Sequence, residues 1–182
     1  VGGQIGALVA AHGKKVSVVA DGMDKQWGKP VIKTVLDSLW ESGIDLAGQV
    51  IAGAGPNAPR EDVYRITEQL HKQDPEVVVS IGGGSTIDAV KAAIALRALG
   101  DRYPELAGYF GMGQVTEMLS AAGRKLIPHV SVMVAASSAA HLTKYSNITD
   151  LVTGQKMLIV DPAVTPVKAL FDYSSTVTQP AS

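Results

Sequence analysis

The 182 residues are 46% apolar and 18% charged, a composition typical of a folded globular domain and not of a disordered chain. The 16 basic and 17 acidic residues give a net charge of −1, so no basic excess favours a nucleic-acid partner. No cysteine is present, which excludes disulfides, thiolate metal sites and cysteine nucleophiles. No signal peptide is visible, and no apolar run approaches the roughly 20 residues that span a membrane. We therefore expect a cytoplasmic protein with neither nucleic-acid nor membrane partners.

Short β-branched runs alternate with amphipathic helical patterns through the first hundred residues. The run from Val77 to Val79 suits a strand that is buried on both faces of a parallel sheet. Pro30 near the start of one helical pattern and Gly43 at its end match the preferences of helix termini. The patterns predict strands at residues 14–21, 49–52 and 76–81, and helices at residues 30–43, 60–72 and 85–99. This alternation indicates a parallel α/β sheet flanked by helices.

The second half of the chain departs from this alternation. We interpret residues 100–125 as a loop that contains a short helix at 114–122, followed by a core strand at 129–136. Runs at residues 143–149 and 155–161 flank a turn containing Thr153 and Gly154, and a last strand is expected at 168–172. The two runs predict an antiparallel β-hairpin added to the parallel core.

The strongest local signal is the segment from Ser80 to Ala93, in which three glycines follow a predicted strand and open a helix. Glycine lets backbone N–H groups approach an anion, and the helix N-terminus adds unpaired donors and a positive partial charge. Together these features predict a phosphate cradle. Ser85 could cap the helix or donate to a phosphate oxygen. We expect Gly84→Val to fill space that belongs to the ligand, although a turn that only packs helix against strand fits the same glycines.

This motif differs from two well-known phosphate-binding loops. It lacks the Gly-Lys-Ser/Thr of a Walker loop, and Ile87 stands where the dinucleotide fingerprint has its last small residue. Asp88 and Lys91 are three residues apart, so they share a helix face on which they can pair. Residues 53–58 do match the fingerprint, but prolines there remove N–H donors. We interpret this second segment as a turn that presents Asn57 to a ligand.

The segment GGGSTIDAVKAA, residues 82–93, resembles the GGGS-x-x-D-x-x-K signature of the iron-containing (group III) alcohol dehydrogenases. The resemblance continues in order over nearly the whole chain: residues 2–14 resemble the family's first helix, 21–23 the end of its first strand, 56–59 its Pro-Asn-Pro-Thr run, and 143–156 its hairpin. The glycine signature alone also occurs in dehydroquinate synthase and in glycerol and glycerol-phosphate dehydrogenases. The ordered set is more specific.

The resemblance implies a Rossmann-like dinucleotide-binding domain over residues 1–182, with NAD lying across the sheet. The pyrophosphate would be held by Gly83, Gly84 and Ser85. We also expect Asp88, in the same signature, to bind the cofactor. In the intact enzyme, a hydride would pass between NAD and a small alcohol or aldehyde. The resemblance also implies assembly into homo-oligomers.

Further cofactor contacts follow from the same resemblance. Asp21 would accept hydrogen bonds from the adenosine ribose, and its carboxylate would repel the 2′-phosphate of NADP, which favours NAD over NADP. Asn57 would lie near the adenosine half of the coenzyme and Lys156 near the nicotinamide ribose. Each charged residue also has a plainer interpretation: Asp21 as a solvated strand end, and Lys156 as a solubilising charge.

One segment departs from the family pattern. Where the family has Thr-Thr-Ala-Gly-Thr-Gly-Ser-Glu, residues 134–141 are Val-Ala-Ala-Ser-Ser-Ala-Ala-His. Ser138 keeps a hydroxyl at the central threonine and is the expected cofactor contact here, whereas His141 replaces the acid. Ser138 and His141 also have the spacing of a nucleophile pair, but no third group is evident, so we disfavour hydrolase chemistry.

The family holds a divalent metal, usually iron, on one aspartate and three histidines in a helical domain that follows the hairpin. The sequence ends before such a domain, and its histidines, at positions 12, 71, 129 and 141, show no ligand spacing. We therefore expect neither catalytic nor metal-binding residues here, NAD binding that is weak or lost, and no turnover by these 182 residues alone.

Two alternatives stay open on the sequence. One keeps the fold but changes the reaction, as in a glycerol or glycerol-phosphate dehydrogenase or a relative of dehydroquinate synthase; the altered residues 134–141 keep it open. The other is a non-catalytic binding module that uses the phosphate cradle for a different nucleotide.

Overall fold

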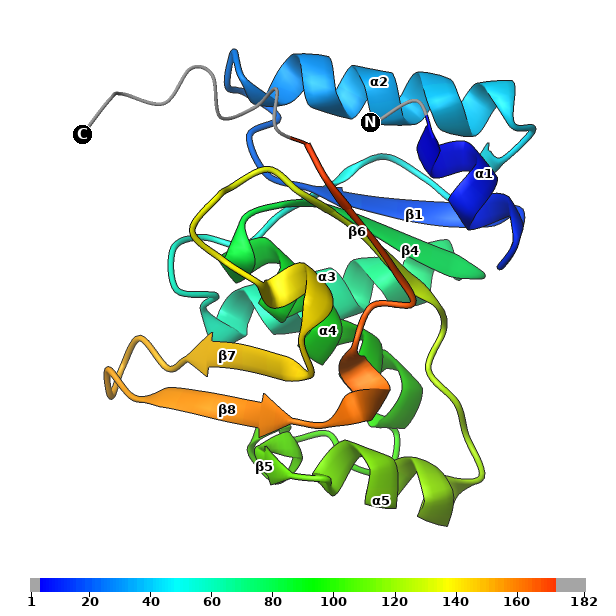
Figure 1. Ribbon diagram of the computed structural model, residues 1–182. Helices are drawn as coiled ribbons and strands as arrows, with labels where there is room; N and C mark the ends of the chain where they lie inside the picture. Colours follow the sequence, from blue (N-terminus) through cyan, green and yellow to red (C-terminus); the bar gives the residue numbers. More distant parts are fainter. Residues whose placement is uncertain (1–3, 173–182) are drawn as a thin grey trace.

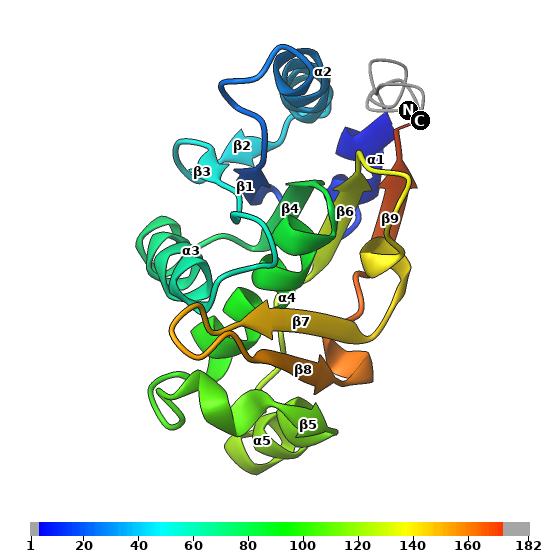
Figure 2. The same ribbon diagram turned by 90° about the vertical axis from the view of Figure 1, so that its left-hand side faces the viewer.

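A parallel sheet forms the centre of the protein. The computed structural model describes residues 4–172 (Figure 1), and the main sheet has the order β2-β1-β4-β6-β9, with β3 paired to the end of β1 (Figure 2). Its strands are β1 (Lys15–Ala20), β2 (Asp45–Leu46), β3 (Ile51–Ala52), β4 (Val77–Gly82), β6 (His129–Met133) and β9 (Lys168–Phe171). All of them run parallel to their neighbours, so their carboxyl ends lie along one edge.

Helices cover both faces of this sheet (Figures 1 and 2). The helices are α1 (Ile5–Ala10) and α2 (Gly28–Glu41) on one face, and α3 (Arg60–Gln73) and α4 (Gly84–Leu99) on the other. Val77, Val79 and Ile81 of β4 pack in a core with α1 and α2, whereas Val78 packs in a core with α3 and α4. The valine run is therefore buried on both faces, which confirms the expectation from the sequence.

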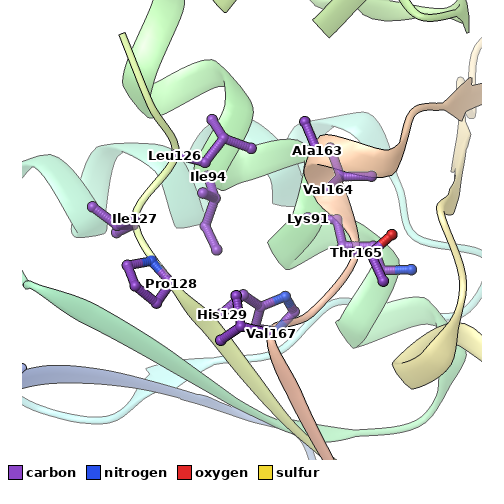
Figure 3. Close-up of a pocket in the computed structure, with 10 residues that line it drawn as sticks. All are labelled: Lys91, Ile94, Leu126, Ile127, Pro128, His129, Ala163, Val164, Thr165 and Val167. Carbon is purple, nitrogen blue, oxygen red and sulfur yellow. The ribbon is translucent and has the colours of Figure 1, made fainter. Parts of the chain in front are cut away.

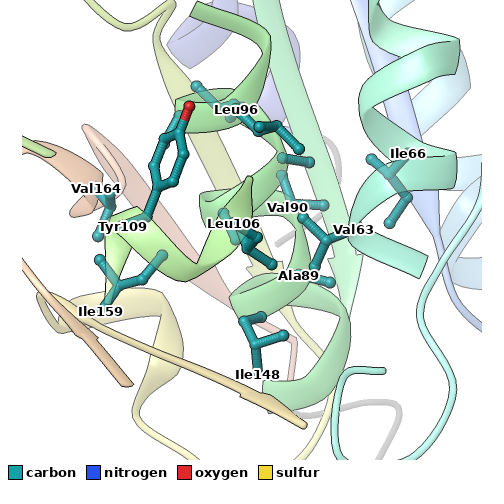
Figure 4. Close-up of a cluster of buried hydrophobic side chains, with 14 of the residues drawn as sticks. Val63, Ile66, Ala89, Val90, Leu96, Leu106, Tyr109, Ile148, Ile159 and Val164 are labelled. Atoms are coloured by element: carbon teal, nitrogen blue, oxygen red, sulfur yellow. The ribbon is translucent and has the colours of Figure 1, made fainter. Parts of the chain in front are cut away.

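Helix α4 is enclosed on all sides. Every residue from Thr86 to Leu96 is buried, because a second, smaller sheet packs on the side of α4 that faces away from the main sheet. This sheet has the order β5-β8-β7, and its strands are β5 (Gly111–Met112), β7 (Tyr145–Thr149) and β8 (Lys156–Val160). Ile148 and Ile159 of this sheet join Ala89 and Val90 of α4 in one apolar cluster (Figure 4). A helix buried in this way needs no polar stripe, which explains its alanine-rich sequence.

The parallel α/β fold is as the sequence predicts, but the hairpin does not join the main sheet. β7 and β8 pair antiparallel as expected, and β8 pairs on its other side with β5. The edge of the main sheet beside β6 is taken by β9, so the apolar residues of the hairpin are buried against α4 instead.

The two-residue strands β2 and β5 are too short to give a sequence pattern. α1 covers only part of residues 2–14, of which residues 2 and 3 lie outside the described range.

The segment between α4 and β6 contains a helix at the residues predicted from the sequence, α5 (Gln114–Ala122). Gly113 and Gly123 flank it with φ values of 75° and 64°, a conformation that glycine adopts without strain. Asp161, just after β8, accepts a hydrogen bond from the Thr116 amide at 2.8 Å and so anchors the first turn of α5 to the hairpin. Within residues 4–172, no helix is long and apolar enough to cross a membrane.

A buried histidine joins two central strands of the main sheet. His129 at the start of β6 is 5% exposed, and its Nε2 lies 2.7 Å from the hydroxyl of Ser80 on β4. Burial, and next the positive charge of Lys91, lower the pKa of His129 to about 3. The imidazole is therefore neutral in the folded protein at neutral pH.

The stability of the fold should consequently fall in mild acid. The unfolded chain binds a proton at a histidine near pH 6.5, whereas folded His129 binds it only near pH 3, so stability is lost as the pH falls below 6.5. Between about pH 7 and about pH 5.5, we expect His129 to account for a loss of about 1 kcal/mol in the free energy of unfolding. Urea denaturation at both pH values should show a smaller loss in His129→Gln than in the wild type. His71→Gln, at an exposed position on α3, is the control and should behave as the wild type does.

Candidate functional site

The segments that the sequence singles out meet at the carboxyl edge of the main sheet. Backbone hydrogen bonds join them there: Asp21 N donates to Ile81 O at 2.9 Å, Gly53 N to Ala20 O at 2.8 Å, and Val134 N to Gly82 O at 3.1 Å. The end of β1, the loop 53–58, the glycine turn 82–85 and the segment 134–141 therefore lie side by side. In open α/β sheets, ligands bind at this edge.

The glycine turn leaves the N-terminus of α4 open. The helix begins at Gly84, and its N-cap residue, Gly83, has extended backbone angles of φ −82° and ψ −173°. No side chain among the described residues caps this end, so the first-turn amides keep their hydrogen-bonding capacity. These donors and the helix dipole favour an anion at the turn.

The two cradle glycines differ in the space around them. A Cβ at Gly83 would meet only Ala135 Cβ at 3.6 Å, an ordinary contact, so the backbone is open at this position. A Cβ at Gly84 would lie 2.6 Å from Ser138 Oγ. The expectation that Gly84→Val intrudes only on a ligand is therefore wrong, because a protein side chain already occupies that space.

Ser85 supports the neighbouring loop and does not cap the helix, which corrects one of the two roles expected for it. Its hydroxyl oxygen accepts from the Asn57 amide at 3.1 Å, and the hydroxyl hydrogen is left to donate elsewhere. Thr86 Oγ1 accepts from Ala54 N at 3.1 Å, and Thr149 Oγ1 donates to Asn57 O at 2.7 Å. Asn57 has a φ of 64°, a conformation that these bonds hold in place.

Asp21 lies directly after β1, at the end of the site nearest β3. Its carboxylate accepts from the Gly22 amide at 2.6 Å, and the residue is half-buried. Gly53 lies against it, because a Cβ at Gly53 would be 3.0 Å from Asp21 N. The carboxylate thus has one intramolecular hydrogen bond and further acceptor capacity at the sheet edge.

On the opposite side of the cradle, an open hollow of about 410 Å³ lies between α4, the segment 138–140 and the second sheet. Ser138 joins the hollow to the cradle, since it lines the hollow and also contacts Gly84. The hydroxyl of Ser138 accepts from Ala140 N at 3.1 Å. The other residues that line the hollow are Asp88, Ala139, Ala140, Thr143, Tyr145, Asn147 and Leu158.

Asp88 and Lys91 form the buried pair that the sequence suggests. Asp88 Oδ1 lies 3.8 Å from Lys91 Nζ, and the Lys91 side chain is fully buried. Burial raises the pKa of Asp88 and lowers the pKa of Lys91 to about 8, because both charged forms lose hydration. Asp88 Oδ2 accepts from Asn147 N at 3.1 Å. The carboxylate thus supports β7 as well as lining the hollow, and its contact with a cofactor stays a prediction.

Lys156 lies at the first position of β8, where it is exposed and paired in register with Thr149. In the same ladder Leu158 pairs with Asn147, and residues two apart on a strand point to the same face. Lys156 therefore shares a face with two residues that line the hollow, but it does not line the hollow itself. Its predicted contact with the nicotinamide ribose is not tested by this arrangement.

Ser138 and His141 do not form a nucleophile pair. The His141 ring lies 5.9 Å from the ring of Phe171, and no hydrogen bond joins it to Ser138 in the described part of the chain. Burial, followed by the charge of Lys91, lowers the pKa of His141. The imidazole at the position of the family's acid is thus a neutral packing group at neutral pH.

A second cavity, of about 100 Å³, lies at the opposite edge of the sheet beside the start of β6 (Figure 3). Lys91 and His129 lie on one side of it and Leu126 and Ile127 on the other.

Among residues 4–172, no three His, Asp or Glu side chains come together in a way that could hold a metal ion.

Sequence reasoning missed the residues that connect the site. Thr86 and Thr149 hold the loop 53–58, and Tyr145 and Asn147 form one wall of the hollow. The Asp and Lys of the glycine signature, at its seventh and tenth positions, give a partial signal, because a helix face that carries Asp88 and Lys91 needs polar partners once it is buried. The partners themselves lie more than 50 residues away in the sequence.

Comparison with known proteins identifies relatives along the whole chain. The model of the iron-containing alcohol dehydrogenase family matches residues 2–173. The NAD-dependent methanol dehydrogenase of Bacillus methanolicus is 28% identical over 98% of this chain and 42% of its own length. The NADPH-dependent butanol dehydrogenase of Clostridium saccharobutylicum is 29% identical over 98% of this chain and 43% of its own.

Solved structures show the same fold. An alcohol dehydrogenase from Oenococcus oeni superposes with a TM-score of 0.82 at 24% identity, covering 98% of this chain and 44% of that one. Sulfoacetaldehyde reductase from Bifidobacterium kashiwanohense, solved in complex with NAD+, gives a TM-score of 0.76 at 23% identity with the same coverage. The chain thus spans less than half the length of these relatives. Because the family model covers nearly all of its residues, the chain belongs to the iron-containing alcohol dehydrogenase family.

Proposed function

We propose that residues 1–182 form the NAD-binding domain of an alcohol dehydrogenase that oxidises a small alcohol or reduces the corresponding aldehyde. The observation that carries the proposal is the uncapped, glycine-lined N-terminus of α4, which lies between a strand-end carboxylate and an open hollow. A dinucleotide has the matching order of groups, with a diphosphate between two nucleosides. The names of the relatives support the same reaction class.

The order of the strands supports a particular orientation of the coenzyme. Asp21 follows β1, the cradle follows β4, and Ser138 follows β6, so the three groups lie in this order along the sheet edge. The adenosine ribose would lie at Asp21, with Asn57 nearby, and the diphosphate at Gly83, Gly84 and Ser85. The nicotinamide half would then lie over the hollow lined by Asp88 and Ser138, on the face of the hairpin that carries Lys156.

NAD, when bound, supplies the hydride acceptor for the alcohol carbon. The residues of this chain would bind and orient it: the α4 amides would donate hydrogen bonds to the diphosphate, and the wall of β7 would limit where the nicotinamide half can lie. We assign coenzyme binding to the described residues. Homo-oligomeric assembly, a cytoplasmic location and the absence of nucleic-acid or membrane partners are part of the same proposal.

The choice of coenzyme rests on Asp21. One relative is named as NAD-dependent and another as NADPH-dependent at nearly equal identity, so overall similarity does not separate the two coenzymes. A carboxylate at the ribose repels a 2′-phosphate, and we therefore propose NAD.

A comparison of nucleotides tests the proposal directly. Because only a dinucleotide spans from Asp21 through the cradle to the hollow, NAD should raise the melting temperature of the protein more than NADP, ATP or inorganic phosphate at equal concentration. Differential scanning fluorimetry measures all four. Stabilisation by ATP that exceeds stabilisation by NAD would contradict the dehydrogenase proposal and favour a binding module for another nucleotide.

Gly83→Ala tests the cradle. The added methyl group has room against Ala135, so we expect a folded protein, but it adds bulk beside the α4 amides and should weaken NAD binding by about tenfold, or ~1.4 kcal/mol. Isothermal titration calorimetry measures the change. Gly108→Ala, where a Cβ lies 3.4 Å from the flexible end of Met118 and far from the cradle, is the control and should bind NAD normally. Equal affinities in all three proteins would refute a phosphate at Gly83.

Asp21→Ala tests the choice between NAD and NADP. Removing the carboxylate removes both the ribose acceptor and the repulsion of a 2′-phosphate, so the ratio of NADP to NAD dissociation constants should fall by about tenfold. Asp24→Ala removes an exposed carboxylate of the same loop, paired with Lys25 at 3.1 Å, and should leave the ratio unchanged. If both variants keep the wild-type ratio, Asp21 does not contact the ribose.

A further inference from the structure

As far as Asn147, helix α4 closes the edge of β7 that faces away from β8, whereas at the end of the strand the Thr149 amide donates to Ala58 O at 3.0 Å. Lys91 Nζ donates to the carbonyl oxygens of Thr143 and Tyr145, both at 2.7 Å. Asp88 Oδ2 accepts from the amide of Asn147, and Ser146 Oγ donates to the main-chain oxygen of Asp88 at 2.8 Å. A free strand edge carries unpaired backbone groups, and here α4 supplies their partners.

Lys91 is the centre of this connection. Its side chain is fully buried, two of its N–H donors bind carbonyl oxygens of the β7 edge, and the ammonium group forms an ion pair with Asp88 Oδ1 at 3.8 Å, which is too long for a hydrogen bond. A buried ammonium group is unfavourable unless such partners are all in place, so the arrangement tolerates little displacement of β7 relative to α4. The contacts of Lys91 therefore restrict the position of β7 relative to α4 more than the surrounding apolar packing does, because apolar side chains can shift without leaving a charge unpaired.

The same residues of β7 form a wall of the hollow beside the cradle. Thr143, Tyr145 and Asn147 line it together with Asp88. Lys91 lies seven residues after Gly84 on one straight helix, about 10 Å along its axis. The helix thus carries the cradle at its N-terminus and holds the wall two turns further along.

We propose that Lys91 is a positioning residue, which ties β7 to α4 and so sets the distance between the phosphate cradle and the wall against which the nicotinamide half of the coenzyme lies. The inference rests on the proposed function and adds a residue that contacts no part of the coenzyme. The inference predicts different requirements for the two halves of the coenzyme. The adenosine diphosphate portion requires the cradle and Asp21, whereas the nicotinamide half requires the wall.

Lys91→Met tests the inference, because methionine keeps much of the length of the side chain and removes the ammonium group. Isothermal titration calorimetry with NAD and with ADP, on the full chain, should show NAD affinity reduced by about tenfold and ADP affinity within about twofold of the wild type. A side chain that merely stabilised the fold would not change the ratio of the two affinities. Ser146→Ala, which removes another link between β7 and α4, should change the ratio in the same direction by a smaller factor.

Leu99→Ala is the matched control. It truncates a buried residue at the end of α4, eight positions after Lys91, so it lowers stability away from the contacts of Lys91 with β7. We expect a lower melting temperature and an unchanged ratio of NAD to ADP affinity.

Two results would overturn the inference: a Lys91→Met protein that binds NAD as the wild type does, or one that loses NAD and ADP affinity in equal proportion. If Lys91→Met does not fold, the ratio measured for Ser146→Ala decides, and an unchanged ratio refutes the positioning role. Because binding by these residues alone is expected to be weak, the titrations extend to about 1 mM nucleotide, and a wild-type protein that binds neither NAD nor ADP at that concentration refutes the proposed function itself, which is a distinct outcome.

Discussion

Two structural requirements, one at the N-terminus of helix α4 and one along its body, call for different kinds of residue. Its N-terminus has to remain open at the sheet edge, where glycine bares the backbone, while its body is packed between two sheets and accepts no exposed polar face. The helix meets both by placing its buried polar groups, Asp88 and Lys91, where they pair with each other and with the edge of β7. Burial of these charges is tolerated because Lys91 donates two hydrogen bonds to backbone carbonyl oxygens and lies beside the opposite charge of Asp88.

This arrangement explains how segments far apart in the sequence form one site. Ser85 and Thr86, in the first turn of α4, hold the loop 53–58, while Asp88 and Lys91, one to two turns on, hold the hairpin. The cradle and the surfaces on either side of it are thus fixed to one rigid element. A site assembled in this way is organised before a ligand arrives, which lowers the entropic cost of binding.

The departure at residues 134–141 has a structural consequence as well as a chemical one. Ser138, which keeps a hydroxyl group, fills the space beside Gly84 and borders the hollow. His141, in place of the family's acid, is neutral and lies against Phe171, so this segment lacks the negative charge that an acid would place near Lys91. The positive charge of Lys91 is then balanced by Asp88.

The sequence by itself determined the parallel α/β core, α5, the glycine turn at the start of α4 and the family, because each depends on periodicity or on residues that are close together in the chain. Only the tertiary structure decided that the hairpin packs on α4 in its own sheet, that Ser85 binds the Asn57 amide instead of capping the helix, and that Ser138 occupies the space beside Gly84. These contacts join residues that lie 28 to 59 positions apart in the sequence. Which face of an element meets which neighbour is set by burial of the whole core, and no local pattern encodes it.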